Sequence, residues 1–152
     1  MAGTSNGLRP EGDHEPRTQY AALPWRRTGA GAVEILLITS RESRRWVIPK
    51  GWPMKDLSPS ETAAQEAFEE AGVRGPTSRD ELGVFHYDKR LRSGRAQHVR
   101  VHVHALQVTE EHADWPEAAE RRKLWTTPAE AAALVDEPEL RALLARFNGP
   151  EG

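Results

Sequence analysis

The chain has 152 residues, of which 38% are hydrophobic, and its formal net charge is -2. This length suits one globular domain with its own hydrophobic core, and the near-neutral charge predicts no overall attraction to nucleic acid or to an anionic membrane. The chain contains no cysteine, which excludes disulfides, thiolate metal sites and a cysteine nucleophile. No apolar run approaches the ~20 residues of a membrane span, and the N-terminus lacks an apolar signal sequence, so we expect a cytoplasmic protein.

The first third of the chain divides into a polar tail and the start of a domain. Residues 1–18 are rich in glycine, proline and charge and predict a disordered N-terminal tail, after which we expect a single domain over residues 19–148. Two apolar runs follow, at residues 20–25 and 32–39, and the aliphatic composition of the second predicts a buried strand. A further short strand is predicted at residues 46–48.

A helix is predicted to begin at Pro59, after a loop at residues 51–57. Ser58 and Glu61 have the spacing of a capping box, and proline suits the first helical position because the N–H group it lacks would have no acceptor within the helix. Gly72 provides a C-terminal stop for this helix.

The rest of the chain predicts more strands and then helices. Residues 81–87 and 98–108 have the composition of long strands joined through a basic turn, and residues 121–125 favour another strand. A second cap-plus-proline pattern at Thr127 and Pro128 precedes apolar spacing typical of one or two short helices. This order predicts an α+β fold in which a mixed central β-sheet packs between helices.

The predicted helix carries a cluster of carboxylates. Glu66, Glu69 and Glu70 have the spacing i, i+3 and i+4, which places them on one helical face, where like charges repel. A hard divalent cation relieves this repulsion and accepts oxygen ligands, and Mg²⁺ held by a few carboxylates commonly takes phosphate oxygens as its other ligands. A solvated acidic face is the alternative for this pattern taken by itself.

The segment that contains these carboxylates resembles the Nudix box, G-x5-E-x7-R-E-U-x-E-E-x-G-U, in which U is aliphatic. Two positions depart from the motif, since Leu57 replaces its first glutamate and Gln65 replaces its arginine. The resemblance implies the Nudix fold, an α/β/α sandwich, and a hydrolase that uses Mg²⁺ or Mn²⁺ to cleave a diphosphate linkage. The matching positions are Gly51, Glu66, Ala67, Glu69, Glu70, Gly72 and Val73.

The resemblance also implies roles for individual residues. It makes Glu66 and Glu70 the principal metal ligands, Glu69 a further ligand or a group that orients water, and Gly51 a part of the metal site. Glutamine at position 65 can form a hydrogen bond but no ion pair with a carboxylate. Looser matches to the diphosphoinositol polyphosphate phosphohydrolase branch of the family occur at residues 35–49, 71–75, 108–110, 114–115, 122–125 and 130–131.

Positive charge gathers in the segment between the two long predicted strands. Only four of the 21 basic residues are lysines, and arginine suits bidentate phosphate binding, although genomic base composition explains the bias equally well. His98, Arg100, His102 and His104 alternate with apolar residues, which predicts one basic face on a strand. A solvated face is the alternative, and RNA binding is disfavoured because few aromatic residues are interleaved. The predicted substrate-binding residues are Arg41, Arg45, Lys50, Lys55, Lys89, Arg90, Arg95 and Arg100.

These observations predict a metal-dependent Nudix hydrolase that acts on a dinucleoside polyphosphate or a diphosphoinositol polyphosphate. The departures at Leu57 and Gln65 leave open a catalytically weakened Nudix-fold module that binds nucleotides or polyphosphates for regulation. We expect a small phosphorylated substrate as the partner, with no membrane or nucleic acid, and a monomer or homodimer. Surface solvation is the favoured role of Glu110 and Glu111, and an additional acid outside the box, at one of these two residues, is the alternative.

Overall fold

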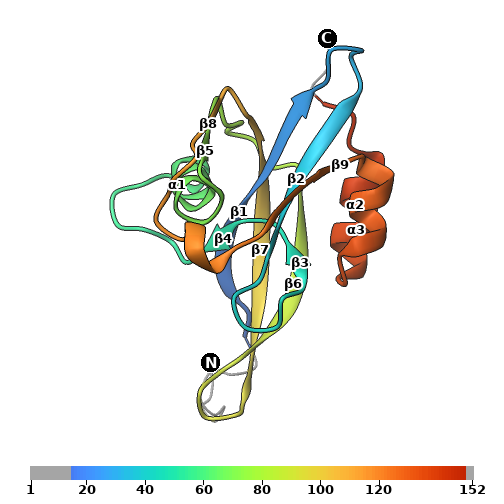
Figure 1. The fold of residues 1–152 in the computed structure, drawn as a ribbon. Coiled ribbons are helices and arrows are strands. Elements are labelled where there is room, and N and C mark those ends of the chain that lie inside the picture. Colours follow the sequence, from blue (N-terminus) through green and yellow to red (C-terminus); the bar gives the residue numbers. More distant parts are fainter. Residues whose placement is uncertain (1–14, 150–152) are drawn as a thin grey trace.

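The computed structural model describes residues 15–149, which form a seven-stranded sheet with helices on both faces (Figure 1). The strands of this sheet are β1 (Arg17–Arg27), β2 (Val33–Thr39), β3 (Trp46–Val47), β4 (Lys50–Gly51), β6 (Gly83–Arg90), β7 (Ala96–Gln107) and β9 (Lys123–Thr126). Their order is β3-β2-β1-β7-β6, with β4 paired to β1 and β9 paired to β2. The pairing of β1 with β7 is parallel and the other pairings are antiparallel, so the sheet is mixed.

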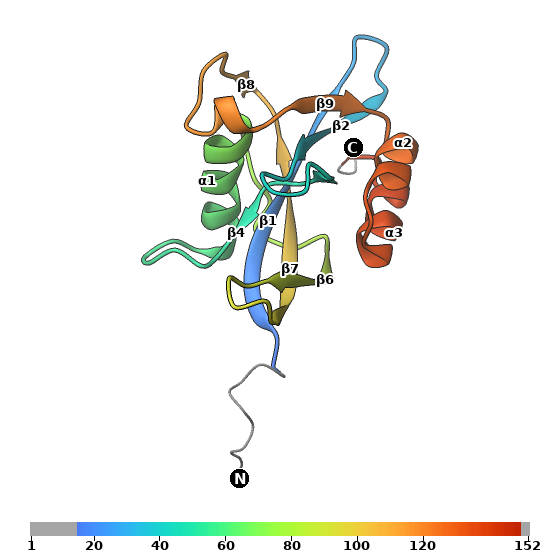
Figure 2. The same cartoon turned by 60° about the horizontal axis from the view of Figure 1, so that its bottom comes forward.

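Helices cover the two faces of the sheet separately. Figures 1 and 2 show α1 on one side of the strands and the pair α2 and α3 on the other. A two-stranded sheet of β5 and β8 lies beside α1. This is the predicted α+β sandwich. The remaining elements are α1 (Pro59–Ala71), β5 (Val73–Arg74), β8 (Glu110–Glu111), the 3-10 helix η3 (Ala118–Glu120), α2 (Pro128–Leu134) and α3 (Pro138–Arg146).

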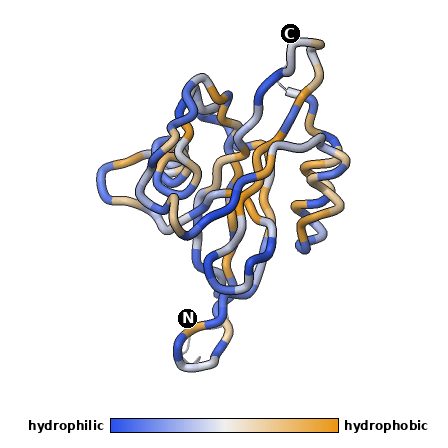
Figure 3. The backbone as a smooth tube through the Cα atoms, in the orientation of Figure 1, coloured by the Kyte–Doolittle hydropathy of each residue, from blue (hydrophilic) through white to orange (hydrophobic). Residues whose placement is uncertain are grey.

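Each face of the sheet buries its own hydrophobic cluster. On the α1 side the contact is made by small side chains, Ala63, Ala67 and Ala71, which let the helix lie close to β1, and Leu36 and Ile38 of β2 belong to the same buried cluster. On the other side leucines of α3 pack against the sheet. Figure 3 shows the apolar residues concentrated in the central strands and the hydrophilic ones along the outer loops. Burial of apolar surface on both faces stabilises the sandwich.

The predicted boundaries of α1 are confirmed. The Ser58 hydroxyl accepts a hydrogen bond from the Glu61 backbone N–H at 3.2 Å, and the Glu61 carboxylate accepts one from the Ser58 N–H at 2.8 Å, which completes the capping box. Gly72 ends the helix in the left-handed region with φ 71°, a conformation that other residues adopt at a cost.

Other boundaries differ from the expectation. Strand β1 begins at Arg17, two residues before the expected start of the domain, because Arg17 and Thr18 continue the parallel ladder with β7. Most of the predicted disordered tail, residues 1–14, lies outside the described residues. The two-residue strands β4, β5 and β8 were not predicted, since so short a segment has no periodicity. Within residues 15–149, none of the helices has the length and apolar character needed to cross a membrane.

Candidate functional site

Glu66 and Glu70 form the buried part of the acidic face of α1. Glu66 is 9% exposed, and the side chain of Glu70 is 13% exposed. Their carboxyl groups lie close enough to interact, and burial together with the charge of Glu70 raises the pKa of Glu66 to about 8. Burial also raises the pKa of Glu70, although Arg121 and Lys50 oppose that shift. The Glu66 carboxyl group therefore favours its protonated form in the folded protein, and a divalent cation can take the place of that proton.

Gly51 allows the Glu66 carboxylate to approach the backbone of β4. A Cβ atom at position 51 would lie 2.0 Å from Glu66 Oε2, so any larger residue would displace the carboxylate. Pairing with Tyr20 of β1 fixes Gly51 in place. The backbone N–H of Lys50 donates to Glu70 Oε1 at 3.4 Å. The strand, the loop and the helix thus bring Gly51, Glu66 and Glu70 together.

Glu69 is near this pair but has a different partner. Its Oε2 accepts a hydrogen bond from Gln65 Nε2 at 2.8 Å. Within residues 15–149, no group of three His, Asp or Glu side chains is already arranged as a metal site. The pair of Glu66 and Glu70 is therefore the preformed part of a candidate site, and Glu69 would have to leave Gln65 to join it.

The acidic face lines a cleft of about 510 Å³ that also contains cationic side chains. Three glutamates of α1 contribute to this lining. Burial lowers the pKa of Lys50, and the Lys50 ammonium lies 4.8 Å from the centre of the Tyr87 ring. The cleft therefore combines oxygen ligands for a cation with donors for phosphate oxygens. Five of the eight predicted substrate-binding residues line it, namely Arg41, Arg45, Lys50, Lys89 and Arg90.

The other three predicted substrate-binding residues are not among those that line the cleft. Lys55 is exposed in the loop before α1, and Arg95 is exposed in the turn between β6 and β7. Arg100 is exposed on β7, where its Nε lies 3.4 Å from His86 Nε2. The sequence pattern could not separate these three from the others, because tertiary packing decides which cationic side chains face the cleft.

Carboxylates pair with His98 and His102 of β7, and His104 is buried beside the Ser78 carbonyl, so the hairpin does not present the continuous basic face that the alternating pattern indicated. His98 pairs with Asp88 directly across the hairpin, and His102 Nδ1 lies 2.6 Å from Glu81 Oε1. Glu81 precedes β6 and reaches β7 only because the two strands pair. Cationic side chains of the cleft also have acidic partners, since Arg41 pairs with Glu120 and Arg45 pairs with Asp136.

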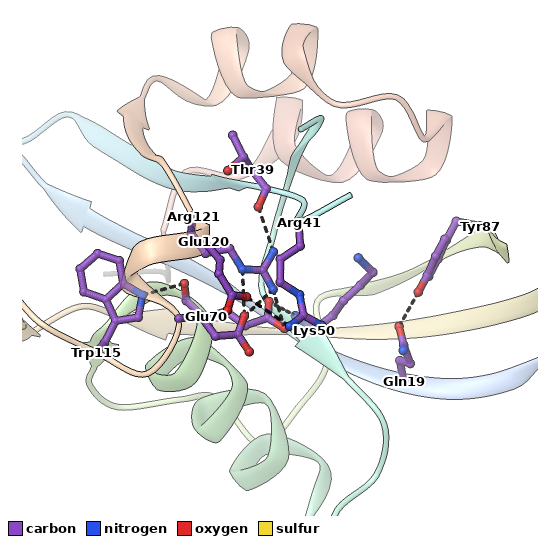
Figure 4. Close-up of polar contacts among 10 residues, drawn as sticks. Gln19, Thr39, Arg41, Lys50, Glu70, Tyr87, Trp115, Glu120 and Arg121 are labelled. Atoms are coloured by element: carbon purple, nitrogen blue, oxygen red, sulfur yellow. Dashed lines mark hydrogen bonds and ion pairs between the residues drawn. The ribbon is translucent and has the colours of Figure 1, made fainter. Parts of the chain in front are cut away.

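Two groups at the cleft were not identified as site residues from the sequence. Figure 4 shows Arg121 beside Glu70, and its Nη2 lies 3.3 Å from Glu70 Oε2. The same guanidinium bonds Glu117 Oε1 at 2.8 Å. Arg121 lies in a segment that the sequence predicts as a strand. Glu117 follows Glu110 and Glu111, the two candidates for an acid outside the box. The pairing of β9 with β2 brings them to α1, and no local signal predicts that contact.

Glu110 and Glu111 lie away from the cleft. Both belong to β8, which pairs with β5. Glu110 lies 3.2 Å from His112, and Glu111 lies 2.9 Å from the Lys123 ammonium. Their carboxylates are thus engaged at the surface, as solvated ion pairs.

A second cavity, of about 470 Å³, lies between the sheet and the end of α3. Trp25, Leu82, Leu143 and Phe147 contribute apolar surface to it, and no carboxylate side chain is among the residues that line it. It has no acid for proton transfer or metal binding, so the acidic and basic cleft is the candidate active site.

The fold and the cleft define a class: an α+β protein in which a carboxylate-bearing helix follows a glycine-containing strand and a loop. The chain belongs to the Nudix family, because the family model of the NUDIX domain matches residues 16–147. One relative is Nudix hydrolase 13, mitochondrial, from Arabidopsis thaliana, which is 33% identical over 120 residues, with 76% of this chain and 59% of the relative covered. Another is diphosphoinositol polyphosphate phosphohydrolase 2 from Rattus norvegicus, which is 36% identical over 105 residues, with 67% of this chain and 54% of the relative covered.

Solved structures support the same fold. An Ap4A hydrolase from C. elegans superposes with a TM-score of 0.62 at 19% sequence identity, with 87% of this chain and 96% of that chain covered. The NUDIX domain of Shewanella oneidensis NrtR, solved with ADP ribose, superposes with a TM-score of 0.64 at 15% identity, with 92% of each chain covered. At these identities the likeness shows the fold alone. The chain spans little more than half the length of the two relatives described above.

Proposed function

We propose that this protein is a Mg²⁺- or Mn²⁺-dependent hydrolase that cleaves a diphosphate linkage in a small polyphosphorylated substrate. The observation that carries the proposal is the composition of the cleft, where the neighbouring carboxyl groups of Glu66 and Glu70 share one cavity with six cationic side chains, those of the five predicted residues and of Arg121. The named hydrolases among the relatives support it.

The residues present fit a hard divalent cation. Glu66 and Glu70 offer oxygen ligands, and Gly51 leaves space for the Glu66 carboxylate where a Cβ atom would fill it. Glu66 and Glu70 would hold the metal, with Glu69 as the further acidic group of the same helix. When bound, the cation would polarise a phosphoryl group and lower the pKa of a water molecule.

The cationic residues of the cleft would bind the rest of the substrate. Arginine forms bidentate bonds with phosphate oxygens, and lysine supplies a point charge. Lys50 directly precedes Gly51, and its backbone N–H donates to Glu70, so this cationic residue adjoins the proposed metal site. Arg41, Arg45, Lys89 and Arg90 would neutralise further phosphates and the negative charge that develops as the diphosphate is cleaved.

A substrate must carry several phosphates to pair with all of these cationic side chains. This favours a dinucleoside polyphosphate or a diphosphoinositol polyphosphate. The name of one relative, diphosphoinositol polyphosphate phosphohydrolase, supports the second of these classes. A cytoplasmic location and a monomeric or dimeric state stay predictions.

A product-resolved assay tests the proposal. Nucleoside diphosphate derivatives, dinucleoside polyphosphates and inositol pyrophosphates would each be incubated with the protein and Mg²⁺ or Mn²⁺. Glu70→Gln removes one ligand charge with little change in shape, so it should abolish metal-dependent turnover while the melting transition remains. Near-full activity of this variant would contradict the proposed metal site.

The second candidate is a Nudix-fold module that binds polyphosphates without cleaving them. Leu57 and Gln65 favour it, because the first acidic position and the arginine position of the box carry no charge, and Leu57 is 40% exposed instead of contributing a carboxylate. Tight binding of a polyphosphate with no product at high Mn²⁺ would select this alternative.

A further inference from the structure

Helix α1 carries the acidic face but contains no basic residue. Its sequence, PSETAAQEAFEEA, has neither lysine nor arginine, and no basic residue stands in its last turn. Position 65, where the Nudix box has arginine, is a glutamine that bonds Glu69. A cation that fixes the orientation of Glu70 must therefore come from another part of the chain.

Arg121 supplies that cation. Its side chain is only 7% exposed, and its Nη2 lies 3.3 Å from Glu70 Oε2. The guanidinium is itself fixed, because Nη1 donates to the Thr39 carbonyl at 2.9 Å and Nε donates to Glu117 Oε1 at 3.0 Å. With the Lys50 N–H on Oε1, both oxygens of Glu70 have a partner whose position is set by the sheet or by a neighbouring segment.

The segment that carries Arg121 is attached to the end of α1. The Glu117 backbone N–H donates to the Glu69 carbonyl at 3.1 Å, and the Trp115 indole N–H donates to the Glu70 carbonyl at 3.0 Å. The Lys123 ammonium donates to the next carbonyl, that of Ala71, at 2.8 Å. These bonds hold residues 115–123 against the last turn of α1. The backbone segments that carry Arg121 and Glu70 are therefore fixed to each other, as their side chains are (Figure 4).

We propose that Arg121 is a positioning residue for Glu70: by holding Oε2, it keeps the carboxylate in the orientation in which it binds the divalent cation. This inference rests on the metal site of the proposed function. It gives the chain a guanidinium partner for the carboxylate helix from outside the box, across about fifty positions of sequence.

Orientation and charge make opposite predictions for the loss of Arg121. A cation close to a metal site repels the metal, so charge alone predicts that a neutral residue at position 121 tightens metal binding. Loss of orientation predicts weaker binding, since mutation of a residue that hydrogen-bonds to a metal ligand typically lowers the metal affinity by about 10- to 100-fold. The sign of the change therefore identifies the role.

The experiment measures binding of Mn²⁺ alone, by electron paramagnetic resonance of the free ion, to the wild type and three variants. Arg121→Gln removes the guanidinium, and Arg121→Lys keeps the charge but cannot bond Thr39, Glu117 and Glu70 at once. Arg122→Gln is the matched control, because Arg122 is an exposed neighbour of the same type. We expect Arg121→Gln to weaken Mn²⁺ binding at least about tenfold, Arg121→Lys to weaken it less, and Arg122→Gln to leave it unchanged.

A thermal melt of each variant without metal monitors the fold. If Arg121→Gln is folded and binds Mn²⁺ as tightly as the wild type or more tightly, the inference is overturned; if that variant does not fold, wild-type affinity in Arg121→Lys overturns it. Glu70→Gln separates this from failure of the proposed function. If Glu70→Gln binds Mn²⁺ as tightly as the wild type, the proposed metal site is contradicted. If Glu70→Gln loses Mn²⁺ binding but Arg121→Gln keeps it, the metal site stands and only the role of Arg121 is contradicted.

Discussion

The two ends of α1 are stabilised in different ways. At the N-terminus, Ser58 and Glu61 satisfy each other's backbone N–H groups, and the partners are three residues apart. At the C-terminus, carbonyls of the last turn accept from Trp115, Glu117 and Lys123, which lie some fifty residues further along the chain. The first arrangement is local and the second is tertiary.

This difference matters because the proposed metal ligands lie in the half of the helix that ends in tertiary contacts. A change at the N-terminal cap alters the stability of the helix but leaves Glu66 and Glu70 with their partners. A change in the segment at residues 115–123 alters the surroundings of the carboxylates as well. Substitutions at the two ends should therefore separate stability from metal binding.

Among substitutions that leave every glutamate of α1 in place, the largest effect is expected from Gly51→Ala. A Cβ atom at this position would lie 2.0 Å from Glu66 Oε2, so the carboxylate must move. A displacement of about 1 Å in a catalytic group commonly costs about a hundredfold in rate, and we expect a loss of that order in metal-dependent turnover. Gly29→Ala is the matched control, since a Cβ atom there meets nothing within 4 Å. Equal activity of the two variants would contradict the described contact of Glu66 with β4.

The next effect is on the pH dependence of stability without metal. The pKa of Glu66 rises from an ordinary value near 4.5 to about 8 in the folded protein. Between these values the folded state binds more protons than the unfolded state, so the free energy of unfolding should fall as the pH rises from about 4.5 to about 8. Urea unfolding at a series of pH values would measure this slope, and Glu66→Gln should flatten it. An unchanged slope in Glu66→Gln would assign the titration to other groups.

Trp115→Phe should affect both stability and metal binding. It keeps an aromatic ring but removes the N–H that donates to the Glu70 carbonyl. Loss of such a bond costs about 1 kcal/mol in the free energy of unfolding, and the loosened last turn should weaken Mn²⁺ binding. Trp125→Phe is the control, because its indole bonds the carboxylate of Glu111 outside the cleft. Equal Mn²⁺ affinity in both variants would mean that the last turn does not position the carboxylates.

Ser58→Ala should have the smallest functional effect. Removing an N-cap hydroxyl costs about 1 kcal/mol of stability. Because the capping box does not touch Glu66 or Glu70, we expect the variant to melt at a lower temperature while its Mn²⁺ affinity stays that of the wild type. A lower Mn²⁺ affinity in the folded variant would show that the N-terminal end also controls the site.

The parts of the structure that could be predicted from the sequence rest on local patterns. The helix at residues 59–71 follows from its cap, its proline and its terminal glycine, and the buried strand at residues 33–39 follows from its aliphatic side chains. The gathering of Glu66 and Glu70 follows from helical spacing. Strand β4 could not be predicted, because two residues have no periodicity and their pairing with β1 depends on the whole sheet.

The sequence by itself determined the family, through the Nudix box, the carboxylate helix, and the chemical types of side chain available for metal and phosphate. Only the tertiary structure decided that Arg121 and Glu117 stand at Glu70, and that acids pair with His98 and His102 of the hairpin. The physical reason is the range of the interactions. Caps and helical periodicity act over three or four residues, whereas the contact of Arg121 with Glu70 exists only after β9 has paired with β2 beside α1.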